Sequence, residues 1–593
     1  LWDEAKYGLD GARLAAALAD LDLLRFAPLV YDLDVWPPLF PLTESMVFLV
    51  AGNGFAVARG LVAVLFAGLV VVTWWAAREI VPKSAAVAAI APALVVTSPF
   101  VQLFAVQAML ELPGALLYVL CLGAYAHHLR TGTRATVVAT GVLSAALFFT
   151  KYNYGLLWLA PLLLNEAWVA CDGPRGVFDR AISRTRRIDL GRPFTLFVAI
   201  YLVALAVIGL TGGGTLRLGE RAVSITSIGN PLLLLVVIVL ARAVWPPRRA
   251  WERWRRWERS LAERHRVLMW TIAIPVVVWL LLPPHLRSFV DFVENRSSGP
   301  PLFTAAGLLF YPRVFLEQYH ARSVIGILVM GSAVVALARI GGAAPAARTL
   351  LLAVVVALAA LTLHPYKEPR FLLIAAPALW LAAAWNVVTA VERGAAHTRR
   401  ERPVWANAAI WTNGVLAVAT LICVLLAPPT APSLAARFAQ YTVPSTYRPL
   451  LDRVAELAEA KPTLVLGTWN QMSPPLIEWS WLQRRRGAFA STPPDVVAPS
   501  RRAPAEQLLR RLRGPSPPDQ IVLLDLDDAT APSAEWAAAF AAETAWLEPL
   551  RRDLDAGATP YDEVLAESLT HGGYRVRVFR VDGRSIPASN RGG

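Results

Sequence analysis

The chain has 593 residues, of which 56% are hydrophobic and only 17% are charged, and its formal net charge is +14 at pH 7. The basic residues lie in short loops between long apolar runs, which is the pattern that orients membrane proteins, so we exclude nucleic acid as a partner. The cysteines are three in number and lie in or at the end of apolar runs, which excludes a disulfide framework.

The chain opens on an external polar segment, residues 1–54, whose first motif is Trp2-Asp3-Glu4-Ala5-Lys6-Tyr7. Because Leu1 stands where a Met is usual, we expect a further membrane span to precede it. The apolar stretch Trp36 to Gly52 starts with Pro37-Pro38, which favours a helix lying in the outer membrane interface over one that crosses. If this stretch crossed, the inside and outside labels of every later loop would be reversed.

A series of apolar runs follows, each about 15 to 23 residues long and able to cross a membrane core of roughly 30 Å. The runs are Phe55–Ala77, Ala85–Val101, Leu112–Ala126, Ala135–Phe149, Tyr154–Ala170, Phe194–Leu210, Ile225–Leu240, Val267–Leu282, Val324–Ala338, Leu350–Leu363, Phe371–Val388 and Ile410–Leu426. They predict an all-α polytopic membrane protein of about 12 spans, plus the preceding one. Alternate loops collect the Lys and Arg residues, so the acid pair and the C-terminal region are expected to face outward from a cell membrane.

After Pro428-Pro429 the composition becomes that of a soluble domain, and three β-rich runs alternate with helical stretches. The runs are Thr463–Gly467, Ile521–Asp525 and Tyr574–Val581. This alternation predicts a small extracytoplasmic α/β domain over residues 428–593, beside a membrane domain over residues 1–427. The acidic cluster at Asp525 ends the middle strand, where it is either a ligand site or a solvated strand end.

Through about Leu426 the chain resembles the lipid-linked-sugar glycosyltransferases of the GT-C superfamily, in the protein O-mannosyltransferase-like and aminoarabinose-transferase-like branch (glycosyltransferase family 39 type). The likeness is carried by the opening Asp3-Glu4 motif, by Trp36-Pro37-Pro38-Leu39 and by Ala58-Arg59. It implies a GT-C fold, an active-site acid pair in the first external loop, and a polyprenyl-phosphate sugar donor. It also implies an inverting single displacement at the outer face of the membrane.

A second element, His364-Pro365-Tyr366-Lys367-Glu368-Pro369-Arg370-Phe371, is similar to the His-Lys-Glu-x-Arg-Phe element of lipid-linked mannosyltransferases in the same superfamily. Two residues are inserted here between His364 and Lys367, so Lys367, Glu368 and Arg370 match better than the histidine. The resemblance implies that His364, Lys367 and Arg370 bind the donor phosphate. The plain alternative for the charged residues is an ion-pair network that closes the outer surface.

Sugar transfer from a phospholipid carrier needs an acceptor oxygen activated by a base and a leaving phosphate stabilised by cations. Asp3 is the candidate base or acceptor-positioning carboxylate, and its neighbour Glu4 is a second catalytic candidate that could also simply orient the loop. Glu111 follows an apolar stretch in the next external turn, where it is either a further catalytic acid or a first-turn acid of the helix beginning near Pro113. Lys151 lies at the outer end of an apolar helix, where it either contacts the donor phosphate or snorkels to the headgroups.

The sequence contains no zinc-ligand spacing, Walker loop or dinucleotide fingerprint in a convincing context. We therefore expect no required cofactor and no dedicated metal site, although Asp3, Glu111 and the substrate could share a divalent cation. The predicted function is transfer of a sugar from a polyprenyl-phosphate donor to a protein, lipid or glycan acceptor of the cell envelope. The alternative is a lipid or polysaccharide flippase, but such a protein places its charges near the bilayer midplane and often has paired halves.

Overall fold

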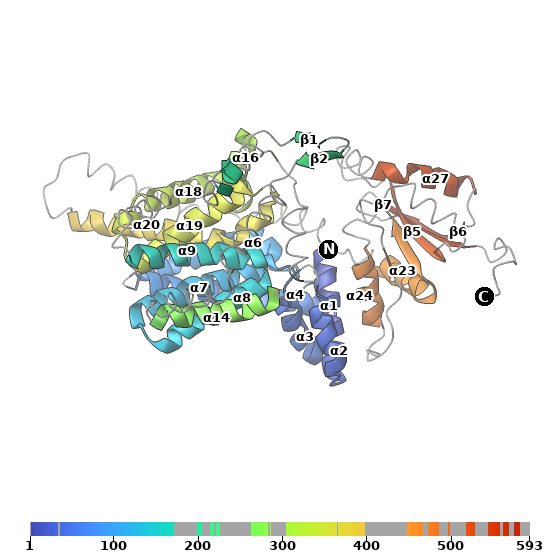
Figure 1. Ribbon diagram of the computed structural model, residues 1–593, viewed down its shortest axis with the longest axis horizontal. Helices are drawn as coiled ribbons and strands as arrows, with labels where there is room; N and C mark the ends of the chain where they lie inside the picture. The colour runs from blue at the N-terminus through green and yellow to red at the C-terminus, as the bar shows by residue number, and fades with distance from the viewer. Residues whose placement is uncertain are drawn as a thin grey trace.

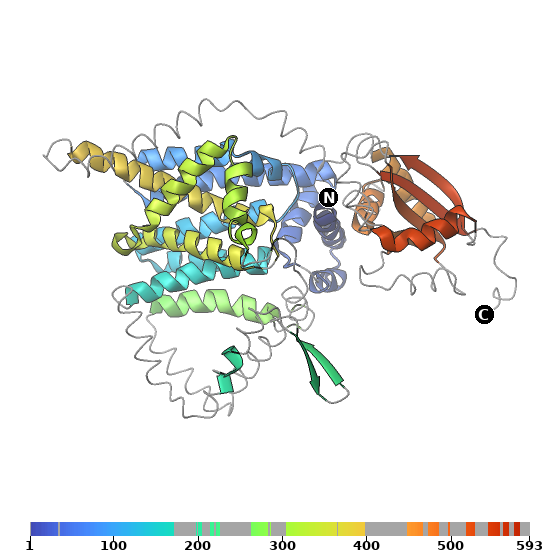
Figure 2. The ribbon, with the colours of Figure 1, turned by 90° about the horizontal axis from the view of Figure 1, so that it is seen from above.

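The computed structural model describes residues 2–33, 36–82, 84–170, 197–198, 200–203, 214–218, 221–225, 263–280, 304–364, 366–397, 448–466, 473–484, 496–497, 518–527, 544–557, 561–568 and 574–581, with the single residues 282, 285 and 300. A bundle of helices forms one part of the molecule and a sheet domain forms the other (Figure 1). The first three helices stand between the two parts, and the view from above keeps the same order (Figure 2).

The N-terminal segment folds into three helices, α1 (Trp2–Ala19), α2 (Leu23–Tyr31) and α3 (Leu39–Ala51). Helices α1 and α2 lie where a loop was expected, whereas α3 lies within the stretch Trp36 to Gly52 that was predicted to be helical. Helix α1 buries Ala5, Leu9, Ala12 and Ala16 at helical spacing. Its first turn holds the acid pair, where negative charge complements the helix dipole. Helix α3 has 13 residues, which at the usual rise reach about 20 Å, and its place in the membrane interface stays a prediction.

The bundle follows in chain order. Its elements are α4 (Phe55–Ile80), α5 (Ala85–Thr97), α6 (Pro99–Phe104), α7 (Glu111–Thr131), α8 (Arg134–Thr150), α9 (Tyr152–Ala170), α14 (Glu263–Leu280), α16 (Ala305–Leu308), α17 (Phe310–Gln318), α18 (Ser323–Leu337), η1 (Ile340–Gly342), α19 (Pro345–Leu363), η2 (Pro369–Ile374) and α20 (Ala376–His397). By length and composition, α4, α7 and α19 are able to cross a membrane. The predicted helical architecture is therefore confirmed.

Some expected spans lie wholly or mostly outside the described residues. They are 194–210, 225–240 and 410–426. The total of about 12 spans, and the domain boundary near residue 428, therefore stay predictions. A two-stranded ribbon, β1 (Gly214–Leu218) with β2 (Arg221–Ile225), lies inside one of the gaps between described helices.

The C-terminal domain is a mixed sheet of five described strands in the order β4-β3-β5-β7-β6. Its elements are α23 (Arg448–Ala460), β3 (Thr463–Leu466), α24 (Pro474–Arg484), β4 (Val496–Val497), β5 (Gln520–Leu526), η3 (Ala545–Leu547), α27 (Glu548–Asp555), β6 (Tyr561–Ser568) and β7 (Tyr574–Val581). The three predicted strands are present as β3, β5 and β7, in a small α/β domain as expected. Strand β6 was not predicted, because an edge strand rich in acidic residues lacks the apolar alternation of a buried one.

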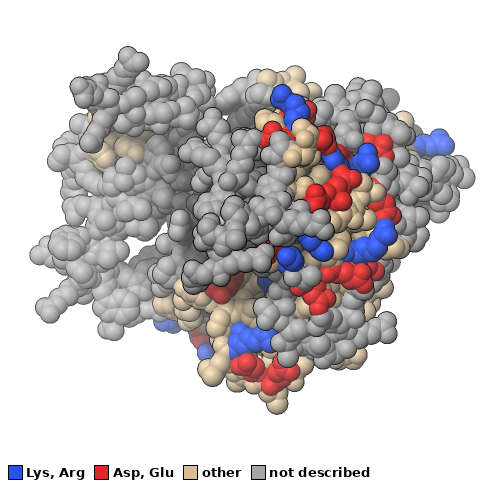
Figure 3. Space-filling view, turned by 90° about the vertical axis from the view of Figure 1, so that its right-hand side faces the viewer, with Lys and Arg blue, Asp and Glu red and all other residues tan. Residues whose placement is uncertain are grey.

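Acidic and basic side chains are interleaved over the described part of the C-terminal face (Figure 3). Arg577 contacts Asp525 at 3.3 Å, Asp555 at 2.7 Å and Glu563 at 2.6 Å, and Arg551 contacts Asp525 at 2.5 Å. These contacts favour a surface ion-pair network at the strand end over a ligand site.

Candidate active site

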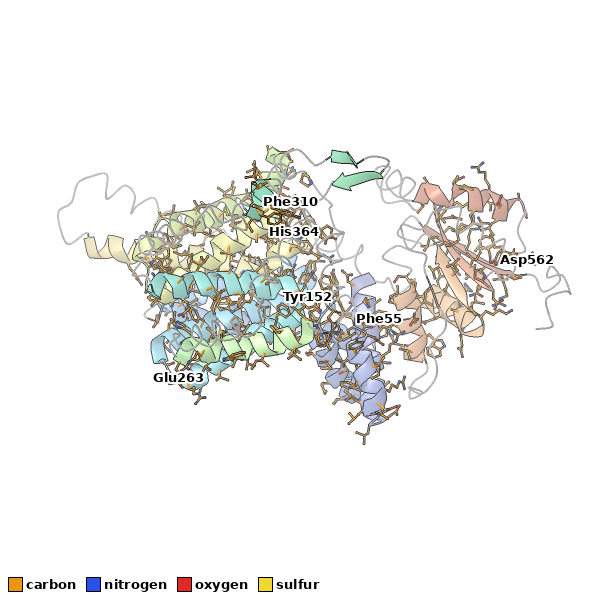
Figure 4. The ribbon with its side chains drawn as sticks, viewed as in Figure 1. Phe55, Tyr152, Glu263, Phe310, His364 and Asp562 are labelled. Carbon is orange, nitrogen blue, oxygen red and sulfur yellow. The ribbon has the colours of Figure 1, made fainter. Side chains whose placement is uncertain are left out.

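The residues predicted for the site gather at one end of the helical bundle, from elements far apart in sequence. Asp3 and Glu4 lie in the first turn of α1, Glu111 at the start of α7, Lys151 at the junction of α8 and α9, and His364, Lys367 and Arg370 in the segment that joins α19 to α20. Tyr152 and His364 mark this end in Figure 4, which faces α1, whereas Glu263 lies at the opposite end. The helix ends bring together what the linear sequence separates.

Arg370 is the centre of a carboxylate network. Its Nη1 donates a hydrogen bond to Oδ2 of Asp3 at 2.7 Å, its Nε lies 3.7 Å from Oε1 of Glu111, and it also pairs with Glu368. Burial alone would raise the pKa of Asp3, but the charge and hydrogen bond of Arg370, together with the charge of Lys151, more than offset it, so this pKa lies below its usual value. Asp3 is therefore an ionised carboxylate in the neutral pH range.

Lys151 is a buried cation in an aromatic enclosure. The residue is 3% exposed, and its Nζ donates to Oε1 of Glu111 at 3.3 Å. The ring centroids of Trp36, Tyr154 and Phe371 lie 4.7, 5.0 and 5.1 Å from the same nitrogen, which is cation–π range. Burial lowers the pKa of Lys151, and Glu111 opposes this effect. An ammonium in this position is not snorkelling to the headgroups.

Glu111 is an acid of the first turn of α7, as one of its two predicted alternatives had it, and its side chain also contacts the candidate site. Leu110 precedes it at the N-cap of α7 and makes no side-chain capping bond. One Glu111 oxygen accepts from Lys151, while Oε2 is buried without a hydrogen-bond partner among the described residues. At Gly114, less than one turn later, a Cβ would meet the Tyr154 ring at 2.4 Å, so only glycine lets α9 approach this closely. Glu111 Oε2 therefore keeps an unused acceptor position inside the protein.

Glu4 is held differently from its neighbour Asp3. Nε and Nη2 of Arg59 donate to its two oxygens at 2.8 and 3.1 Å, and the backbone N–H of Ala108 donates at 3.1 Å. The residue is 1% exposed. These contacts fill the carboxylate and support an orienting role, in which Glu4 fixes α1 to α4, over a catalytic one.

Lys367 and His364 are occupied by backbone groups. Nζ of Lys367 donates to the carbonyl oxygens of Thr362 and His364, the latter at 3.0 Å, where the last turn of α19 leaves carbonyls unpaired. The Nδ1 of His364 lies 3.1 Å from the amide nitrogen of Tyr366 and 2.9 Å from its carbonyl oxygen. Among the described contacts, neither side chain joins the network around Arg370. Their phosphate-binding role stays a prediction.

Sequence reasoning missed the partners that fix these groups. Arg59 and Trp36 could have been predicted as site residues, because both belong to the motifs that carry the GT-C resemblance. Nothing in the sequence indicated Tyr154 or Phe371, because an aromatic residue in an apolar run is usually a core residue or a membrane-interface residue. Only the fold places these rings around Lys151.

A divalent cation in this site would have to be held by the carboxylates of Asp3 and Glu111. Within the described residues, no three His, Cys, Asp or Glu side chains lie close enough together to hold a metal ion. Arg370 pairs with both Asp3 and Glu111, and Lys151 pairs with Glu111, so the charge of the carboxylates is already balanced by protein cations. The absence of a required cofactor stays a prediction.

No protein-family model and no curated protein matches the chain. Among solved structures, the chain is similar to ArnT from Cupriavidus metallidurans bound to undecaprenyl phosphate, at 13% identity and a TM-score of 0.46, over 98% of this chain and 94% of that one. The apo ArnT structure matches at 14% identity and a TM-score of 0.47, over 98% and 93% of the two chains. The Archaeoglobus fulgidus oligosaccharyltransferase with Zn and sulfate matches at 13% and 0.44, over 93% and 65%. Likeness at this level assigns no activity.

Proposed function

We propose that this protein is an integral membrane glycosyltransferase, which moves a sugar from a polyprenyl-phosphate donor to an acceptor at the outer face of a cell membrane. The proposal is carried by the network Asp3–Arg370–Glu111–Lys151 at one end of an apolar helical bundle. A base and two cations at such a position match the needs of lipid-linked sugar transfer. The resemblance of the two sequence motifs to the GT-C superfamily supports the same reaction.

Asp3 suits the role of general base. Its side chain is 34% exposed, compared with 2% for Glu111 and 2% for Glu4, so it is the carboxylate that an incoming acceptor can reach. It is ionised because Arg370 lowers its pKa. In the proposed step, Asp3 takes the acceptor hydroxyl proton while the acceptor oxygen forms a bond to the anomeric carbon.

The bond from the anomeric carbon to the phosphate oxygen breaks in the same displacement, and the polyprenyl phosphate leaves with the electron pair. Lys151 and Arg370 would stabilise the negative charge that grows on this phosphate. The buried, unpaired Oε2 of Glu111 would accept a hydrogen bond from a sugar hydroxyl that reaches it and so orient the ring. Attack from the face opposite the phosphate inverts the anomeric centre.

The test uses the full chain purified in lipid, with a panel of polyprenyl-phosphate sugars and candidate acceptors. Wild-type protein should release polyprenyl phosphate and form a glycosylated acceptor, and Asp3→Asn should lower turnover by roughly 100-fold to 10,000-fold. Asp20→Asn is the matched control, because Asp20 lies just beyond α1 with a side chain 49% exposed. Movement of the intact lipid across vesicles without sugar transfer would instead identify a flippase.

A further inference from the structure

Helix α24 of the C-terminal domain packs on the helix that carries the acid pair. The Trp479 indole is fully buried, and it lies against Gly8 so closely that a Cβ there would be 2.2 Å from its Cη2. The ring also packs on Phe55, with centroids 3.9 Å apart, and Nε1 donates to the carbonyl oxygen of Asn53 at 2.9 Å. Figure 4 shows Phe55 on the side of α4 nearest α24. One indole therefore joins α1 and the start of α4.

A second contact holds α1 and α24 together. Nη2 of Arg13 on α1 pairs with Oε2 of Glu478 at 2.5 Å, next to Trp479 in the chain. Within the C-terminal domain, Ser480 Oγ donates to Asp452 at 2.5 Å, which fastens α24 to α23. The indole and its two neighbours thus connect the body of the C-terminal domain with α1.

The position of Trp479 relative to the acid pair is specific. Gly8 lies one helical turn after Glu4 on α1, and Phe55 lies one turn before Arg59 on α4, so each pair shares a helix face. Trp479 accordingly fills the space between the two helices one turn away from the Glu4–Arg59 ion pair.

We propose that α24 is a positioning element for the acid pair, and that Trp479 acts through α1 to hold Asp3 at hydrogen-bonding distance from Arg370. This inference rests on the proposed glycosyltransferase function. Asp3 precedes Glu4 in the same turn, so a tilt of α1 moves Asp3 relative to Arg370, which belongs to another element. A displacement of about 1 Å is enough to cost a reaction about 100-fold in rate.

The experiment compares Trp479→Ala with Trp481→Ala in the full chain. Trp481 is a buried indole on the same helix, about 200° further round its axis, so its loss disturbs the C-terminal domain by a similar volume. Trp479→Ala should lower kcat by roughly 100-fold with a much smaller change in KM for the donor. It should also move the acid limb of the pH–rate profile to higher pH, because Asp3 loses contact with Arg370. Trp479→Phe should restore most of the rate.

Charge reversal tests the docking without reference to turnover. Arg13→Glu and Glu478→Arg should each lower the midpoint of thermal unfolding, and the double reversal should recover it. The positioning role would be overturned if Trp479→Ala and Trp481→Ala lost rate equally and the acid limb of the pH–rate profile did not move. This holds even if charge reversal shows that Arg13 and Glu478 pair. If wild-type protein turned over none of the donors, the proposed function would fall and this inference with it.

Discussion

The Arg370 guanidinium donates a hydrogen bond to the Asp3 carboxylate at 2.7 Å, between residues 367 positions apart in the chain. This contact ties the first turn of α1 to the segment after α19, the two places that carry the two sequence motifs. It also sets the charge state of the candidate base, because Arg370 offsets the effect of burial on the pKa of Asp3.

Replacing Arg370 by Gln should therefore change the pH dependence of the reaction. Without the guanidinium, burial is opposed chiefly by the weaker effect of the Lys151 charge, so the pKa of Asp3 rises and the acid limb of kcat/KM should move to higher pH by about 1 to 3 units. The measurement is a pH–rate profile. Arg313→Gln is the control, because its guanidinium pairs with Glu317 on a surface where the Arg313 side chain is 76% exposed. A pH–rate profile that is unchanged in both variants would show that Arg370 does not control the ionisation of Asp3.

Lys151 and Lys367 should have different functions, the first in donor binding and the second in stability. Lys151→Met should weaken donor binding by roughly 10-fold to 100-fold, since it removes a charge-assisted contact to the phosphate. Because the change also orphans Glu111, the double variant Lys151→Met/Glu111→Gln is measured beside it. Lys367→Met should lower the thermal midpoint, through loss of the α19 carbonyl contacts, and leave donor affinity within about 2-fold. The reverse outcome would make Lys367 the phosphate ligand that the motif implied.

Glu4 should behave as a structural residue. Glu4→Gln leaves Arg59 without its carboxylate partner in a site where Glu4 is almost wholly buried, and should cost on the order of 3 kcal/mol in free energy of unfolding. A double-mutant cycle with Arg59→Met by denaturant unfolding measures the coupling between the pair. If Glu4→Gln kept full stability but lost turnover, Glu4 would be a catalytic residue and not a structural one.

Glu44 predicts a pH dependence of stability. It lies buried on α3, both carboxylate oxygens lack a partner among the described residues, and burial raises its pKa well above 4.5, with Asp10 and Glu4 adding to the effect. The folded state then binds a proton that the unfolded state has released, so stability falls as pH rises above about 4.5. Glu44→Gln should flatten this slope in thermal unfolding between pH 4 and pH 8. A slope equal to that of the wild type would show that other groups cause it.

The sequence determined the membrane character of the chain, because apolar runs with basic loops have few other solutions. It also singled out the acid pair, Glu111, Lys151 and Arg370, because these charged residues lie at the ends of apolar runs or within the two motifs that resemble the GT-C superfamily. The C-terminal α/β domain followed from its strand and helix periodicities.

Only the tertiary structure decided what each group does. Asp3 and Glu4 are adjacent and chemically alike, yet neighbouring helical residues point about 100° apart, so one meets Arg370 and the other meets Arg59. Lys151 and Lys367 are likewise indistinguishable by residue type, but one is enclosed by rings and a carboxylate while the other caps α19. Periodicity determines which face a residue occupies, and the packing of distant elements determines what that face meets.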